Sequence, residues 1–507
     1  MFKLAPIFTN NMVLQRECEI LIWGEAEENS NITAEICGNR SHCVALEGKF
    51  ELILPRLSAG GPFELKVYTK EQEVKLENIL IGEVWIAGGQ SNMEFKLKDS
   101  IKGKLYISNS NYNEIRYFNV PQVEFEDEKG KIPQLDFEEW KISSPENSGD
   151  FSAVAYHFAK NLHNDLNVPI GIINCNKGGT SASCWLSEKY LSEDEELKNA
   201  YLDTYYNIIE NLNDDEADKM TAEFLKSQED YVKKEEQYKK LYPERGAEEV
   251  RRDIGLYPWP PPVNRKAYGR PNGLYNTMLK KVIPYRVKGV IWYQGEEDSQ
   301  KPHLYRKLFK KLIENWREAF RNENLPFSFV QLPMFDDDRP ESWAIVRDAQ
   351  LSTFRNVKNT SMIVAADCGE EKDVHPKDKK PIGERLAIIT LEDVYKKSVN
   401  GHSPMYSGYE IKDNKIIISF DYIKDGELCT IDGSPLKGFE ICAQDKKYVE
   451  AQAEIAGDKV IVWNEKVANP VAVRYGWKNY IEVNLCNENK LPAATFNTEI
   501  NYYNINK

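Results

Sequence analysis

A serine at position 91 stands where an apolar strand is expected to end, which is how a chain presents a hydroxyl nucleophile. The run from Val84 to Ala87 is apolar, and Gly88 and Gly89 allow a tight turn before Ser91. Glycine adopts positive φ angles at little steric cost and lets the backbone or a substrate approach closely. The pattern predicts a hydroxyl at the carboxyl edge of a buried strand. The alternative is a plain strand-to-helix turn in which Ser91 only caps the helix.

A histidine late in the chain, His375, is the candidate base for that hydroxyl. A serine nucleophile requires a base with a pKa of about 6.5 and an acid that orients the base. The chain has six histidines, and His375 alone follows the last predicted strand of the α/β region beside an acid, Asp373. In an extended loop this spacing points both side chains to the same side. We therefore expect Ser91, His375 and Asp373 to act together, with Glu296 and Glu297 as alternative orienting acids.

Acyl transfer also needs preorganised hydrogen-bond donors that stabilise the tetrahedral oxyanion, each worth about 3–4 kcal/mol. The backbone N–H groups of Ser91 and Gly179 and the side-chain amide of Gln294 are the predicted donors. Gly179 belongs to a double glycine, for which a plain tight turn is the alternative interpretation.

These candidate groups follow the strands of a predicted parallel α/β sheet flanked by helices. Between residues 79 and 395, apolar runs alternate with longer amphipathic segments, as in sheets that are covered on both faces. Ligands bind such sheets beyond the carboxyl ends of the strands, which is where the candidate groups lie. The five predicted strands are Val84–Ala87, Ile170–Asn174, Val287–Tyr293, Phe327–Leu332 and Met362–Ala366.

All-β segments are predicted on both sides of this catalytic domain. Residues 1–78 contain short alternating runs typical of a small sandwich, and residues 396–507 return to a β pattern. An acidic insertion at about 187–253 has apolar residues on one helical face, which predicts two or three solvated helices. A proline-rich loop at 258–262 then leads back to the domain.

Composition narrows the function classes. The 507 residues are 41% hydrophobic and 29% charged, as in a globular protein, and no apolar run approaches the roughly 20 residues that cross a bilayer. A net charge of −14 argues against nucleic acid or an anionic membrane as the main partner.

The nine scattered cysteines predict reduced thiols, and the amino terminus lacks signal-peptide features, so a cytoplasmic location is expected unless a leader was removed. The histidines lack metal-ligand spacing, so no metal or cofactor is expected. The oligomeric state stays open, a homo-oligomer included.

Several further residues are candidates for substrate binding. Tryptophans can stack on sugar rings, although tryptophans near strand ends are more often part of the core. The tryptophans considered are Trp85, Trp185, Trp259 and Trp292, and the substrate-binding candidates are Asn92, Trp185, Arg270, Asn276 and Glu296.

Seven segments, spread in order over most of the chain, resemble motifs of the sialate O-acetylesterase family in the SGNH (GDSL-like) hydrolase superfamily. They are Phe-Thr-Asn-Asn-Met-Val-Leu-Gln-Arg (8–16), Gly-Gln-Ser-Asn-Met (89–93), Gly-Gly-Thr (178–180), Leu-Tyr-Asn-Thr-Met (274–278), Trp-Tyr-Gln-Gly-Glu-Glu-Asp (292–298), Asp-Val-His-Pro (373–376) and Ile-Gly-Glu-Arg-Leu-Ala (382–387).

The resemblance implies an SGNH-type parallel sheet and an esterase that removes O-acetyl groups from carbohydrates through an acetyl-serine. It assigns the nucleophile to Ser91, the base to His375 and the oxyanion donors to Ser91, Gly179 and Gln294. Gln294 stands where the wider superfamily has asparagine. The superfamily spaces its acid and histidine as Asp-x-x-His, so the shorter Asp373-Val374-His375 spacing puts the role of Asp373 in question.

Other functions remain open at this stage. The substrate could be an acetylated hemicellulose oligosaccharide (xylan or mannan) rather than a sialate, and the scaffold could bind carbohydrate without catalysis. A lipase-like esterase is disfavoured because the chain lacks a Gly-x-Ser-x-Gly elbow, and a zinc deacetylase is disfavoured by the histidine spacing.

Overall fold

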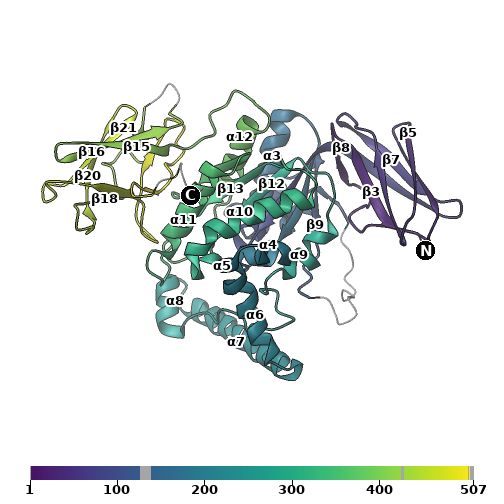
Figure 1. Ribbon diagram of the computed structural model, residues 1–507, viewed down its shortest axis with the longest axis horizontal. Coiled ribbons are helices and arrows are strands. Elements are labelled where there is room, and N and C mark those ends of the chain that lie inside the picture. The colour runs from purple at the N-terminus through teal and green to yellow at the C-terminus, as the bar shows by residue number, and fades with distance from the viewer. Residues whose placement is uncertain (1, 126–138, 424–426, 501, 503–507) are drawn as a thin grey trace.

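A large mixed β-sheet forms the centre of the protein (Figure 1). The computed structural model describes residues 2–125, 139–423, 427–500 and 502. The main path of the sheet runs β10-β9-β11-β8-β12-β13-β14, in which β10 is an antiparallel edge and the other strands are parallel. All five predicted strands are present. The strands of this path are β8 (Glu73–Gly89), β9 (Tyr112–Asn119), β10 (Lys141–Ser143), β11 (Ile170–Asn176), β12 (Gly289–Tyr293), β13 (Phe327–Gln331) and β14 (Thr360–Val364).

Two strands of the sheet, β9 and β10, were not predicted. Strand β9 has a charged residue, Arg116, within its buried half, which interrupts the apolar run expected of a buried strand. The Arg116 guanidinium is satisfied there, since it donates to the carbonyl oxygens of Asn11 and Asn78 and to the Asn78 side chain. Burial lowers its pKa to about 10. Hydrogen-bond acceptors from distant segments of the chain therefore allow the charged Arg116 to be buried within this strand.

Strand β8 links the amino-terminal strands to the central sheet. Its first half pairs with β7 and β2, and its second half pairs with β11 and β12. The predicted domain boundary between residues 78 and 79 lies inside this strand. The amino-terminal strands are β1 (Lys3–Leu4), β2 (Val13–Gln15), β3 (Ile20–Glu25), β4 (Asn31–Ile36), β5 (Asn39–Val44), β6 (Lys49–Leu54) and β7 (Gly60–Tyr68).

Helices pack in pairs beside the sheet, α3 with α12 and α10 with α11 (Figure 1). Gly383 allows α12 to approach α3, because a Cβ there would lie 2.6 Å from the Val154 carbonyl oxygen. The helices outside the insertion are α1 (Ser91–Glu94), α2 (Gly103–Ser108), α3 (Ala153–Leu166), α9 (Gly273–Thr277), α10 (Pro302–Ala319), α11 (Ser342–Asn356) and α12 (Lys380–Asp393).

The acidic segment is helical, and in Figure 1 its longest helix, α7, lies at the lower edge of the molecule. The buried residues of α7 are Ala217 and Tyr238, and pairs such as Lys233 and Glu229 line its exposed face. The segment forms five α-helices rather than two or three. They are α4 (Glu188–Ser192), α5 (Glu195–Leu197), α6 (Thr204–Glu210), α7 (Asp214–Leu241) and α8 (Ala247–Ile254).

Antiparallel sheets at the carboxyl end complete the fold, as the all-β prediction for this region expected. The buried guanidinium of Arg347 on α11 ties them to the helices, because it donates to the Gly476 carbonyl at 2.8 Å. Among the described residues, no helix is both long enough and apolar enough to span a bilayer. The carboxyl-terminal strands are β15 (Met405–Lys412), β16 (Lys415–Asp421), β17 (Cys429–Thr430), β18 (Phe439–Cys442), β19 (Val449–Glu450), β20 (Gln452–Ala456), β21 (Lys459–Trp463), β22 (Ala472–Tyr475), β23 (Leu485–Cys486) and β24 (Phe496–Asn497).

Candidate active site

Ser91 is the first residue of α1, at the point where β8 ends. The turn requires glycine at position 89, where φ is +137° and a Cβ would lie 2.1 Å from the Tyr293 carbonyl oxygen on β12. The Ser91 side chain is half-buried. The hydroxyl therefore stands at the carboxyl edge of the central sheet and keeps contact with solvent.

His375 lies on the loop between β14 and α12, and its imidazole faces Ser91. The distance from His375 Nε2 to Ser91 Oγ is 2.8 Å, although 284 positions separate the two residues. A serine hydroxyl that contacts an imidazole at hydrogen-bonding distance is the geometry in which a histidine can take the serine proton. The structure thus brings together the two residues that the sequence analysis singled out.

A buried network centred on Asn92 holds the histidine loop against α1. The Asn92 amide donates to the Val374 carbonyl at 2.9 Å and to Glu296 Oε1 at 2.6 Å, and its oxygen accepts from Lys379 Nζ at 2.5 Å. Burial raises the pKa of Glu296 and lowers that of Lys379 to about 8. Asn92 is 0% and Glu296 is 6% exposed, so the polar groups of these two substrate-binding candidates face the histidine loop and each other rather than solvent.

Asp373 does not hydrogen-bond to the His375 imidazole. Its Oδ1 accepts the backbone N–H of His375 at 2.9 Å, because a short aspartate side chain readily bonds to its own backbone two residues on. The loop bends here rather than running extended, which is why the predicted arrangement fails. Among the described residues, neither alternative acid replaces it, since Glu296 bonds to Asn92 and Glu297 bonds to Trp259 and Gln300.

One predicted oxyanion donor is the N–H of the serine itself, and a second, Gly179, follows a residue that packs against the serine. The first N–H groups of a helix have no intrahelical acceptor, which leaves the Ser91 N–H available. The Gly178 backbone packs against Ser91, and its N–H donates to Glu94 Oε2 at 2.6 Å. The next residue, Gly179, has a φ of +65°, and no described residue accepts a hydrogen bond from its N–H. This N–H therefore has no acceptor among the described residues.

The third predicted donor, the Gln294 amide, hydrogen-bonds to other protein groups in this structure. Its amide donates to Asp298 Oδ2 at 2.5 Å and to the Thr180 carbonyl at 3.2 Å, and the side chain is 0% exposed. Its oxygen accepts from the Tyr305 hydroxyl at 2.9 Å. Gln294 therefore anchors the glycine turn to β12 instead of facing the reacting carbonyl.

The remaining substrate-binding candidates lie in different surroundings. Trp185 is fully buried and its indole N–H donates to Thr180 Oγ1 at 3.0 Å, so it supports the glycine turn from within the core. The Asn276 amide bonds to Asn272 at 2.5 Å. Arg270, in contrast, lines a cavity next to the site.

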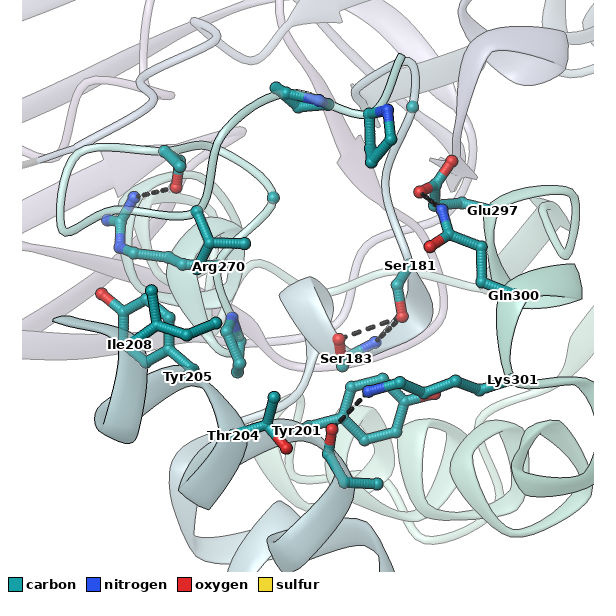
Figure 2. Close-up of a pocket in the computed structure, with 18 of the residues that line it drawn as sticks. Ser181, Ser183, Tyr201, Thr204, Tyr205, Ile208, Arg270, Glu297, Gln300 and Lys301 are labelled. Carbon is teal, nitrogen blue, oxygen red and sulfur yellow. Dashed lines mark hydrogen bonds between the residues drawn. The ribbon is translucent and has the colours of Figure 1, made fainter. Parts of the chain in front are cut away.

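That cavity has a volume of about 210 Å³ and opens beside Gly179, between the sheet edge and α6. In Figure 2, Arg270 lies across the cavity from Glu297 and Gln300, and Tyr205 and Ile208 approach from α6. The insertion thus contributes one wall of a space that adjoins Gly179.

Two further residues lie at the site: Lys379, which has no role in the sequence analysis, and Trp259, which was considered there only as one of four tryptophans that could stack on a sugar. Lys379 is buried behind the histidine loop, and no motif marks it. Trp259 lies over Gly179, where a Cβ would be 2.2 Å from the indole, and its N–H donates to Glu297 Oε2 at 3.2 Å. A tryptophan within a run of prolines was the signal for it, although nothing in the sequence connects that loop to Gly179.

Burial and the charges around His375 predict how the activity depends on pH. Burial, with the Lys379 ammonium, lowers the pKa of His375 from its ordinary value of 6.5, while Asp373 and Glu94 oppose the shift. A base must be neutral to accept a proton, so activity is lost as the pH falls through the pKa of the folded protein. We expect kcat/KM for 4-nitrophenyl acetate to be flat at neutral pH and to reach half its maximum below pH 6.5. An acid limb centred above this value would contradict the assignment of His375.

Comparisons with known proteins agree with one another. The family model described as "Carbohydrate esterase, sialic acid-specific acetylesterase" matches residues 263–392. Sialate O-acetylesterase of Mus musculus is 25% identical over 99% of this chain and 95% of its own length, and that of Homo sapiens is 24% identical over 94% and 88%. The crystal structure of a carbohydrate acetylesterase from Xanthomonas citri superposes with a TM-score of 0.79, at 30% identity over 98% of this chain and 99% of that chain.

An α/β sheet with a serine and a histidine in contact at its carboxyl edge, together with these matches, defines a carboxylic ester hydrolase. The chain belongs to the sialate O-acetylesterase family of carbohydrate esterases.

Proposed function

We propose that this enzyme removes O-acetyl groups from sugars through an acetyl-serine intermediate on Ser91. The observation that carries the proposal is the 2.8 Å distance between Ser91 Oγ and His375 Nε2, next to the unoccupied N–H of Gly179. The names of the relatives, sialate O-acetylesterase and carbohydrate acetylesterase, support acetyl esters of sugars as the substrate class.

The proposed reaction is that of an SGNH-type serine esterase. His375 Nε2 takes the Ser91 proton as Oγ attacks the acetyl carbonyl carbon, and the N–H groups of Ser91 and Gly179 stabilise the oxyanion. The imidazolium then protonates the departing sugar oxygen, which leaves acetyl-Ser91. Water attacks this ester after giving a proton to His375, and acetate leaves as Ser91 recovers its proton.

A fluorophosphonate probe tests the nucleophile, because it reacts covalently with activated serines. We expect the intact mass to increase by one adduct and peptide mapping to find the adduct on Ser91. The Ser91→Ala variant should stay unlabelled. A wild-type protein that does not react, or that reacts at another serine, would instead favour the non-catalytic carbohydrate-binding alternative.

The sugar is best identified by acetate release. A panel of O-acetylated sialic acid, acetylated xylan, acetylated mannan and small acetylated sugars covers the substrates that the family and the sequence suggest. The substrate with the highest kcat/KM defines the preferred class.

A further inference from the structure

Trp259 differs from the other three tryptophans considered for sugar binding. Trp85, Trp185 and Trp292 are 0–1% exposed and belong to the core. The Trp259 side chain is 40% exposed and lies at the edge of the sheet, in the loop that returns from the helical insertion. It is therefore the one of the four that a substrate can reach.

The position of the Trp259 indole is defined on two sides. One edge of the ring packs on Gly179, so closely that a Cβ at that residue would lie 2.2 Å from it. The indole N–H donates to Glu297 Oε2 at 3.2 Å. Since Gly178 packs against Ser91, the ring lies next to the turn that faces the nucleophile.

The cavity beside Trp259 has the composition of a sugar site. Its walls include Pro260, Pro261 and Ile208, while hydroxyl and amide groups of Thr204 and Gln300 lie at its borders (Figure 2). Pyranose rings present apolar C–H faces and polar hydroxyl edges, so they match walls of this kind. The volume of about 210 Å³ is below the roughly 300–1,000 Å³ of drug-sized pockets, which suits a single sugar ring.

We propose that Trp259 and this cavity form the subsite that recognises the acetylated sugar, with the indole stacked on the C–H face of one ring. The proposal rests on the proposed function, because it places the sugar relative to the acetyl group on Ser91. In this proposal the helical insertion takes part in substrate binding, because Tyr205 and Ile208 of α6 line the cavity.

Glu297 is a positioning residue in this arrangement, because it acts through the indole. Its carboxylate accepts from Trp259 and from the Gln300 amide. Burial and the neighbouring Asp298 raise the pKa of Glu297 to about 8, and the indole hydrogen bond opposes that shift. A glutamine at this position keeps an oxygen that can accept the indole N–H, whereas an alanine does not.

The test compares a sugar ester with an ester that has no sugar. Glucose pentaacetate and ethyl acetate share the acetyl group, so the ratio of their kcat/KM values isolates recognition of the sugar. We expect Trp259→Ala to lower this ratio by about 10- to 30-fold, as truncation of an aromatic anchor at a binding site does, because ethyl acetate has no ring to stack on the indole. Trp259→Phe should lose less, because it keeps an aromatic face.

Matched variants separate recognition from general damage. Glu297→Gln should keep the wild-type ratio, Glu297→Ala should lower it, and Trp463→Ala, in the distant strand β21, should leave both esters unaffected. Equal losses on both esters in Trp259→Ala, an unchanged ratio, or a wild type without preference for the sugar ester would overturn the subsite. If the proposed function itself were wrong, a different result would be seen: the Ser91→Ala variant would still hydrolyse ethyl acetate.

Discussion

Replacing Ser91 with alanine is expected to lower kcat for acetyl esters by about 10⁴- to 10⁶-fold. The change removes the oxygen that attacks the carbonyl, while the Gly179 N–H and the binding surface stay in place. Because the side chain is half-buried and loses one atom, the fold should persist. Acetate release from 4-nitrophenyl acetate and from an acetylated sugar measures the loss, and circular dichroism with thermal melting tests the fold.

Ser108→Ala is the matched control. Ser108 is exposed at the end of α2, so the same substitution there should leave kcat and the melting temperature at wild-type values. Turnover in Ser91→Ala within an order of magnitude of wild type, in a folded protein, would exclude Ser91 as the nucleophile.

Replacing His375 with alanine should cause a loss of similar size, about 10⁴-fold or more, because among the described residues no other imidazole hydrogen-bonds to Ser91 Oγ. Asp373→Asn should behave differently. The asparagine oxygen can still accept the His375 backbone N–H, and the imidazole loses no hydrogen bond. We expect less than about tenfold loss in kcat, whereas removing an acid that does orient the imidazole costs about 10⁴-fold. Stopped assays of both variants with 4-nitrophenyl acetate measure the contrast.

The pH profile adds a second readout for Asp373. Its charge raises the pKa of His375, so neutralising it should move the acid limb of kcat/KM to lower pH. His303→Ala, at an exposed position on α10, is the control for histidine removal. If Asp373→Asn proves as inactive as His375→Ala, the carboxylate must reorient onto the imidazole during catalysis, contrary to the geometry described above.

Local sequence determined five of the seven strands on the main path of the central sheet and the turn that presents Ser91. Buried parallel strands need apolar side chains on both faces, so they can be recognised without knowing their neighbours. The turn could be predicted because position 89 requires a glycine. Strand β9 was missed because Arg116 breaks the apolar pattern, and its hydrogen-bond partners come from distant segments.

Tertiary structure alone decided which polar groups face the reaction. The amides of Asn92 and Gln294 can serve a substrate or a scaffold equally well, and here they bond to Glu296, Lys379 and Asp298. Trp259 reaches Gly179 only because the insertion returns its loop to the sheet edge. The sequence shows which side chain stands at each position. It does not show which distant segment supplies the hydrogen-bond partner of that side chain. Sequence therefore singled out the serine and histidine that the structure brings into contact, and three-dimensional contacts defined the surroundings of that pair.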